Sequence, residues 1–180
     1  MACKACYQYG MRPPLQPVAP SIDDPIELLT ACHDKVRRFA GLLPRLRDHL
    51  LDKGLDAPSQ DAARAILRYF DVAAPLHHDD EEDDLFPALR KLQRPELDLT
   101  MDQLEAEHGE LASLWHSLHP WLQATADGQP CDLPDTLDSF VQRYVAHAQR
   151  EEDAVYPHAT DLTADQISRI SAAMVARRTA

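Results

Sequence analysis

The chain has 180 residues and a formal net charge of −12; hydrophobic residues make up 44% of it and charged residues 27%. This length predicts one domain with a sizeable core, and the composition is ordinary for a globular protein. The acidic balance argues against nucleic acid or an anionic membrane as partner, and no apolar run is long enough to cross a bilayer.

Residues 1–22 contain four prolines and no periodic pattern, which predicts an extended or disordered leader. The first ten residues lack the apolar segment of a signal peptide, so a cytoplasmic location is expected. Cys3 and Cys6 form an isolated CxxC pair in this leader. Without a second pair, this spacing favours reduced thiols over a redox or thiolate-metal site.

From Asp23 onward glycine is scarce and no strand-like alternation occurs, so helices are expected. The first begins at an Asp-Pro cap, and the second should bend near Pro75 and Pro87. The four long helices are predicted at about 23–51, 58–92, 99–126 and 134–158. A capping box then starts a shorter helix that ends near Arg177. The pattern predicts an all-α, antiparallel up-down-up-down four-helix bundle at 23–160, with an extra C-terminal helix within 161–180.

Each long helix has one apolar face, marked by steps of three and four residues, and each face carries a histidine. On the second and fourth helices a glutamate follows one turn later. Counting 1.5 Å per residue from the helix ends places all six side chains at about one level. Buried carboxylates need a partner, and the faces offer no Arg or Lys there, so a cation is the simplest one. The predicted metal ligands are His33, His77, Glu81, His108, His147 and Glu151.

The polar neighbours of these residues are expected to lie off the core. Glu82 and Glu152 point about 100° from the ligand faces and are candidates for contacts with the ligands themselves. The rest of the acidic run is interpreted as a solvated face, formed by His78, Asp79, Asp80, Asp83 and Asp84. Surface or boundary positions are predicted for His49, His116, His119 and His158.

Two strings repeat one pattern of His, Glu-Glu, an aliphatic residue, an aromatic residue and Pro. They are HHDDEEDDLFPAL at 77–89 and HAQREEDAVYPHA at 147–159. Together with ACHDKV and EHGEL, they make residues 24–160 resemble the hemerythrin-like family, the HHE cation-binding domain. Ferritin-like bundles use the order Glu-x-x-His instead. The resemblance implies that His33 and His77 serve one metal, that His108 and His147 serve the other, and that Glu81 and Glu151 bridge both.

Imidazole and carboxylate ligands without thiolate suit iron, manganese or zinc. Two iron ions with an oxo or hydroxo bridge are expected; manganese or mixed occupancy is the second choice, and tetrahedral zinc would not need six ligands. One position departs from the family's oxygen carriers, because Ala112 stands where their third helix has a second histidine. The ligands then fill about ten of the twelve bonds of two octahedral ions and leave about one open position on each.

The leading functional hypothesis is binding without a catalytic cycle: sensing of O₂, NO or iron status, or iron handling. The alternative is a di-iron oxidase or peroxidase that uses the open positions on O₂ or peroxide. A scaffold with vestigial ligands is disfavoured, because all six ligands are present. The sequence identifies no protein partner and leaves a homo-oligomer open.

Overall fold

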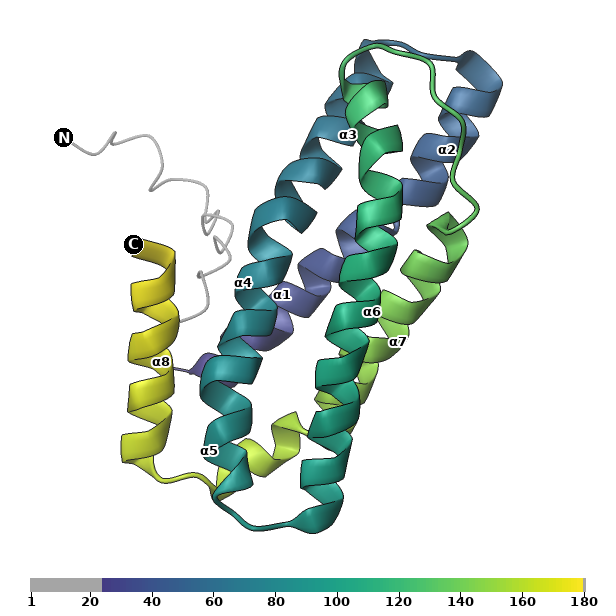
Figure 1. The fold of residues 1–180 in the computed structure, drawn as a ribbon. Helices are drawn as coiled ribbons and strands as arrows, with labels where there is room; N and C mark the ends of the chain where they lie inside the picture. The colour runs from purple at the N-terminus through teal and green to yellow at the C-terminus, as the bar shows by residue number, and fades with distance from the viewer. Residues whose placement is uncertain (1–23, 180) are drawn as a thin grey trace, which may run out of the picture.

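The computed structural model describes residues 24–179, so the predicted leader and its cysteine pair lie outside the described residues. The described part of the chain is helical and contains no strand, which confirms the all-α prediction. Figure 1 shows the long helical segments lying lengthwise beside one another, with α8 along one side. Within residues 24–179, no helix has the length and apolar character needed to cross a membrane.

The first predicted helix is present as α1 (Pro25–Ala40) and α2 (Leu42–Lys53), which are separated only at Gly41. The Asp24 carboxylate caps α1 by accepting hydrogen bonds from the backbone N–H groups of Ile26 at 2.9 Å and Glu27 at 3.1 Å. Gly41 keeps a right-handed helical conformation, and its N–H donates to the Arg37 carbonyl at 3.0 Å. The helical path therefore continues through Gly41 nearly as far as predicted.

The second predicted helix is divided by two π-helical turns. Its parts are α3 (Ala57–Arg68), a turn at Tyr69–Ala73, α4 (Ala74–Asp80), a turn at Glu81–Leu85, and α5 (Phe86–Arg90). Each turn ends two residues before a proline: the Ala74 N–H donates to the Tyr69 carbonyl, and the Phe86 N–H donates to the Glu81 carbonyl. Because proline lacks an N–H and its ring collides with the preceding turn, the wider π turns accommodate Pro75 and Pro87.

The remaining helices differ from the predicted bounds by a few residues. Helix α6 (Pro95–Ala126) begins four residues before the predicted start, with Pro95 as its first residue. Helix α7 (Leu137–Ala154) is shorter than predicted, and a 3₁₀ turn at Tyr156–Asp161 follows it. Helix α8 (Ala164–Thr179) follows the predicted capping box, in which the Thr163 N–H donates to Gln166 Oε1 at 2.9 Å.

Two hydrophobic clusters fill the bundle, one on each side of a polar layer. Along α1, Leu29 belongs to one cluster and Val36 to the other, and His33 lies between them. Along α6, His108 lies between Leu104 and Leu111 in the same way. Each fully buried Leu or Phe contributes roughly 1.5–3 kcal/mol. The two clusters therefore hold the helices at a fixed height and place the histidines at one level.

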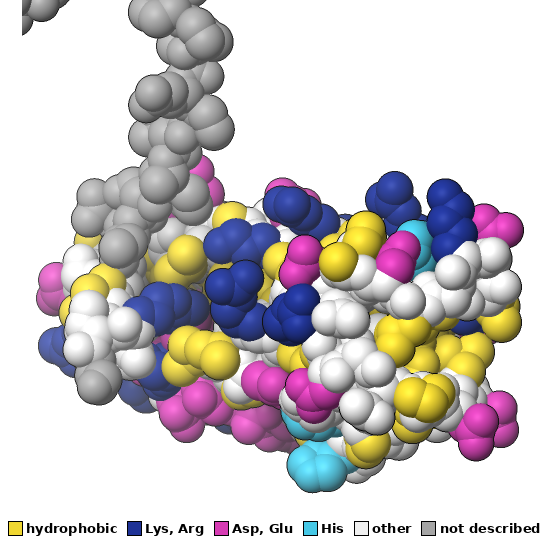
Figure 2. Space-filling view, turned by 90° about the horizontal axis from the view of Figure 1, so that it is seen from above, with side chains coloured by type: hydrophobic (Ala, Val, Ile, Leu, Met, Phe, Trp, Pro, Cys, Tyr) yellow, Lys and Arg dark blue, Asp and Glu magenta, His cyan; other side chains and the backbone are white. Residues whose placement is uncertain are grey.

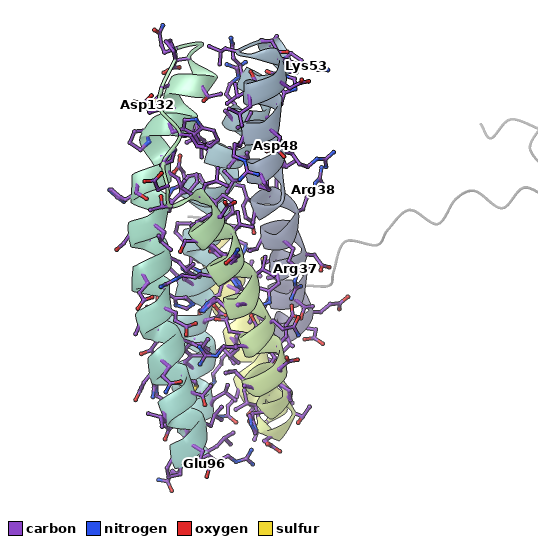
Figure 3. All side chains as sticks on the ribbon, turned by 90° about the vertical axis from the view of Figure 1, so that its right-hand side faces the viewer. Arg37, Arg38, Asp48, Lys53, Glu96 and Asp132 are labelled. Atoms are coloured by element: carbon purple, nitrogen blue, oxygen red, sulfur yellow. The ribbon has the colours of Figure 1, made fainter. Side chains whose placement is uncertain are left out.

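Figure 3 shows the length of the bundle, with Lys53 at the end where α2 stops and Glu96 at the opposite end, where α6 starts. Arg37 lies on α1 between these two ends. Figure 2 shows acidic and basic side chains interspersed with hydrophobic groups on the face seen from above. Despite the net negative charge, that face carries a mixture of both signs.

Candidate metal centre

Four of the predicted ligands meet in one buried group. His33 comes from α1, His77 from α4, Glu81 from the π turn and Glu151 from α7, and all four are 0% exposed. One ligand atom of each lies within 4.8 Å of the others. The other two predicted ligands, His108 on α6 and His147 on α7, belong to an adjoining group that also includes His78.

Glu151 lies between histidines of three helices. Its Oε2 is 3.1 Å from His33 Nε2, and its Oε1 is 2.9 Å from His147 Nε2 and 3.3 Å from His108 Nε2. His33 and His147 belong to different halves of the predicted site. One carboxylate thus contacts both halves, which is the position that a bridging ligand must occupy.

Glu81 reaches both halves from the opposite side. Its Oε2 is 3.6 Å from His77 Nε2 and 3.6 Å from His108 Nε2. Its Oε1 accepts a 2.6 Å hydrogen bond from the Tyr156 hydroxyl, whose ring stacks on His33 at 5.3 Å between centroids. The sequence analysis missed Tyr156, although it is the aromatic residue of the second repeat and replaces the Phe86 of the first.

Several buried polar atoms of this layer have no hydrogen-bond partner among residues 24–179. They include both ring nitrogens of His77 and the Oε2 atom of Glu81. Leaving such a group unsatisfied costs about 1–3 kcal/mol. Nitrogen and oxygen donors directed into one buried space match the ligand preference of iron or manganese. The residues present therefore fit a bound metal cation.

The two central carboxyl groups have opposite pKa shifts. Burial, together with the charge of Glu151, raises the pKa of Glu81 well above its usual value. Burial also opposes ionisation of Glu151, but hydrogen bonds from the surrounding histidines hold its pKa well below the usual range. The two carboxyl groups therefore differ in their affinity for a proton, and a cation that binds both would compete with protonation of Glu81.

Three ligand histidines are held by outer carboxylates through Nδ1. Nδ1 of His33 lies 2.9 Å from Glu152, and Nδ1 of His108 lies 2.5 Å from Glu82. An Nδ1–H that donates to a carboxylate leaves Nε2 as the free lone pair for a metal. Glu82 and Glu152 thus contact two of the predicted ligands, His108 and His33. The second glutamate of each repeated string therefore contacts a histidine outside the repeat: Glu82 contacts His108 on α6, and Glu152 contacts His33 on α1.

His147 has an outer carboxylate that the sequence analysis missed. Its Nδ1 lies 3.0 Å from Glu107, which also pairs with Arg150. Burial alone would lower the pKa of His147, but contacts with Glu151 and Glu107 raise it. The sequence feature that could have identified Glu107 is its position directly before His108, in the EHGEL string. At the matching position before His33 the chain has Cys32.

The interpretation of the acidic run as a solvated face is wrong for Asp80. This carboxylate is 0% exposed and pairs with Arg177 at 2.6 Å and with Arg178. Asp84 is largely buried beneath Arg177 as well, at 2.8 Å, whereas Asp79 and Asp83 are exposed as expected. The reason is that α8 covers this face of α4, and the helix-face analysis treated the four long helices without α8.

His78 also departs from the solvated face. Its ring stacks on His108 with a centroid distance of 3.9 Å and an interplanar angle of 12°. Its Nε2 lies 2.9 Å from the Tyr144 hydroxyl, and burial lowers its pKa. The contacts with His108 of α6 and Tyr144 of α7 place this side chain at the edge of the polar layer. The other four histidines are not fully buried, as predicted.

Histidines and carboxylates from four helical segments, buried between two hydrophobic clusters, define a metal-binding helical bundle. The family model described as the hemerythrin HHE cation binding domain matches residues 24–159, and the chain belongs to this family. It is also similar to an uncharacterized protein of Haemophilus influenzae. The two are 38% identical over 157 residues, which cover 87% of this chain and 91% of that protein.

Proposed function

We propose that the chain is a non-haem di-iron protein of hemerythrin type that binds or senses O₂ or NO, or handles iron. His33 and His77 would hold one iron, and His108 and His147 the other. Glu81 and Glu151 would bridge them. The observation that carries this proposal is that each central carboxylate contacts histidines of both halves.

The chain's own residues define what such a centre can do. The outer carboxylates orient the imidazoles, Tyr156 holds one bridging carboxylate, and the two hydrophobic clusters exclude water from above and below. A pair of ferrous ions bound here would supply the electrons for reversible or irreversible reaction with O₂, peroxide or NO.

The antiparallel up-down-up-down topology and the domain limits 23–160 and 161–180 belong to the same proposal. Their support is the pairing of long helices, with α1 against α7, α3 against α6 and α6 against α7. These neighbours bring ligands from four segments to one layer, as the proposed centre requires.

Metal analysis tests the proposal directly. Anaerobic reconstitution with ferrous iron should saturate at about two irons per chain, and exposure to air should produce near-ultraviolet absorption from an oxo-bridged ferric pair. Saturation at one ion per chain would contradict the dinuclear assignment. Binding of two manganese ions in preference to iron would support the dinuclear site but contradict iron as its metal.

A second candidate is a di-iron oxidase or peroxidase, favoured by the cavity that opens beside His108. Access of this kind would allow a substrate to reach the centre. Repeated turnover of hydrogen peroxide with an added reductant would support the enzyme. A single stoichiometric reaction would support the binding protein.

A further inference from the structure

A cavity of about 790 Å³ opens on one side of the polar layer, between α4 and α6. Among its lining residues are His78, Glu82, His108, Ala112, Trp115 and Tyr144. It thus begins at a predicted ligand of one metal and extends along α6 past Trp115. The volume is many times the roughly 30 Å³ that one water molecule occupies in the liquid.

The opposite half of the site is closed at the equivalent place. The α1 segment around His33 matches the α6 segment around His108, with Ala31 and Val36 corresponding to Ala106 and Leu111. In this match Arg37 corresponds to Ala112. Arg37 donates a 2.7 Å hydrogen bond to Glu152, the carboxylate that supports His33. The methyl group of Ala112 is too short to contact Glu82, and both residues line the cavity.

His78 lies at the inner end of this cavity. One of its ring nitrogens is within 4.8 Å of a ring nitrogen of His108 and of His147. An imidazole binds a metal in the plane of its ring, and the His78 and His108 rings are nearly parallel and stacked. Both rings cannot then direct lone pairs at the same ion. The stacked arrangement places His78 beside the metal position without making it a ligand.

Tyr144 determines which nitrogen of His78 can act as a donor. Its hydroxyl lies 2.9 Å from His78 Nε2. When the phenol donates this hydrogen bond, Nε2 is the acceptor and the neutral ring carries its proton on Nδ1. An N–H is thereby available for another acceptor. Tyr144 is 3% exposed, so the pair is fixed inside the bundle.

We propose that the cavity is the entry path and binding site for a small anionic ligand of the metal held by His108 and His147, and that His78 donates a hydrogen bond to that ligand. This inference rests on the proposed function. Ala112 provides the space, and Tyr144 orients the donor. His78 is a positioning residue for the bound ligand.

Azide titration of the oxidised, iron-loaded full chain tests the inference, with the azide-to-iron visible absorption and the iron content as readouts. Loss of one hydrogen bond to a charged ligand predicts about tenfold weaker azide binding for His78→Leu, with about two irons per chain retained. His78→Gln keeps an N–H donor and should stay within about threefold of the wild type. Tyr144→Phe should weaken azide binding by an intermediate amount.

His158→Leu is the matched control, because His158 does not line the cavity and its side chain is 37% exposed on the 3₁₀ turn after α7. It should leave azide binding unchanged. An unchanged azide affinity in both His78→Leu and Tyr144→Phe, at full iron content, would overturn the inference. Loss of one iron in His78→Leu would also overturn it, since His78 would then be a ligand. A wild-type chain that holds fewer than two irons would contradict the proposed function itself.

Discussion

The two halves of the centre are built from the same repeated string but differ in what surrounds them. Around His33 and His77, Arg37 covers the outer carboxylate Glu152, whose side chain is 19% exposed. Around His108 and His147, the corresponding Glu82 side chain is 42% exposed and borders the cavity. The difference teaches that the repeat supplies most of the histidines and glutamates of the layer, whereas residues outside it decide how exposed each outer carboxylate is.

Helix α8 adds to the same asymmetry. It packs on α1 and α4, and its Arg178 neutralises the buried Asp80 next to Glu81. In the second repeat the residue matching Asp80 is Arg150, which stabilises Glu107 instead. The closed half is therefore covered by α8 and by Arg37, whereas the other half is flanked by the pair of Arg150 with Glu107.

The largest expected effect comes from the residues that the two halves share. Glu81→Gln and Glu151→Gln should each weaken binding of the ion pair by more than about 100-fold, beyond the 10–100-fold typical of outer-shell partners. Glu151→Gln should be the more severe, because Glu151 contacts histidines of three helices. Iron content per chain and helical circular dichroism are the measurements. If a variant keeps two tightly bound irons, the replaced carboxylate is not a bridging ligand.

The next effect concerns the helix that covers the closed half. Arg177→Ala combined with Arg178→Ala leaves Asp80 as a buried charge without a partner. Because both arginines are partly exposed, the metal-free fold should lose about 2–3 kcal/mol, less than for a fully buried ion pair. Urea denaturation measures this loss. Arg169→Ala is the control, because Arg169 lies exposed on the same helix, and its change should stay within about 0.5 kcal/mol. Equal midpoints for the double variant and the control would contradict the stabilising role of α8.

The outer carboxylates should show the asymmetry of the two halves directly. Glu152→Gln should weaken binding of one iron by about 10–100-fold, whereas Glu82→Gln should have a smaller effect on the other. The reason is that water can replace a carboxylate that is 42% exposed more easily than one that is 19% exposed. Competition with a chelator measures both affinities. Glu110→Gln, an exposed change on α6, should leave both unaltered.

An arginine in place of Ala112 should close the open half. Ala112→Arg would place a guanidinium beside Glu82 and close the cavity, which should slow azide association about tenfold at unchanged iron content. Arg37→Ala should uncover Glu152 and have little effect on azide binding at the open half. Rapid-mixing absorbance measures the rates. Unchanged association in Ala112→Arg would show that azide enters by another path.

The smallest expected effect is a change in the number of protons released when the metal binds. Because the pKa of Glu81 is raised in the metal-free chain, this carboxyl stays protonated above its usual titration range, and metal binding must release the proton. Apparent iron affinity should therefore rise with pH until the raised pKa is passed and then become constant. At iron concentrations that saturate both proteins, a pH indicator should record about one proton fewer per bound iron pair for Glu81→Gln than for the wild type. Equal release would show that Glu81 is already ionised.

The sequence by itself determined the helical class, the apolar faces and the six residues that meet in the polar layer. Steps of three and four residues place a histidine on each core face, and this local geometry does not depend on how the helices are arranged. The prolines likewise predicted where the second helix would be irregular. The two outer glutamates were accessible as well, because each follows a predicted ligand by one position in the repeat.

Only the tertiary structure decided which residues complete the layer from neighbouring helices. Tyr156 reaches Glu81 across 75 positions of sequence, Glu107 reaches His147 across 40, and Arg178 reaches Asp80 across 98. Helix periodicity describes one helix at a time, so it assigned Asp80 and His78 to solvent when α8 and α6 cover them. The closed and open halves differ for the same reason: burial, partner and access at each residue depend on the helix packed against it.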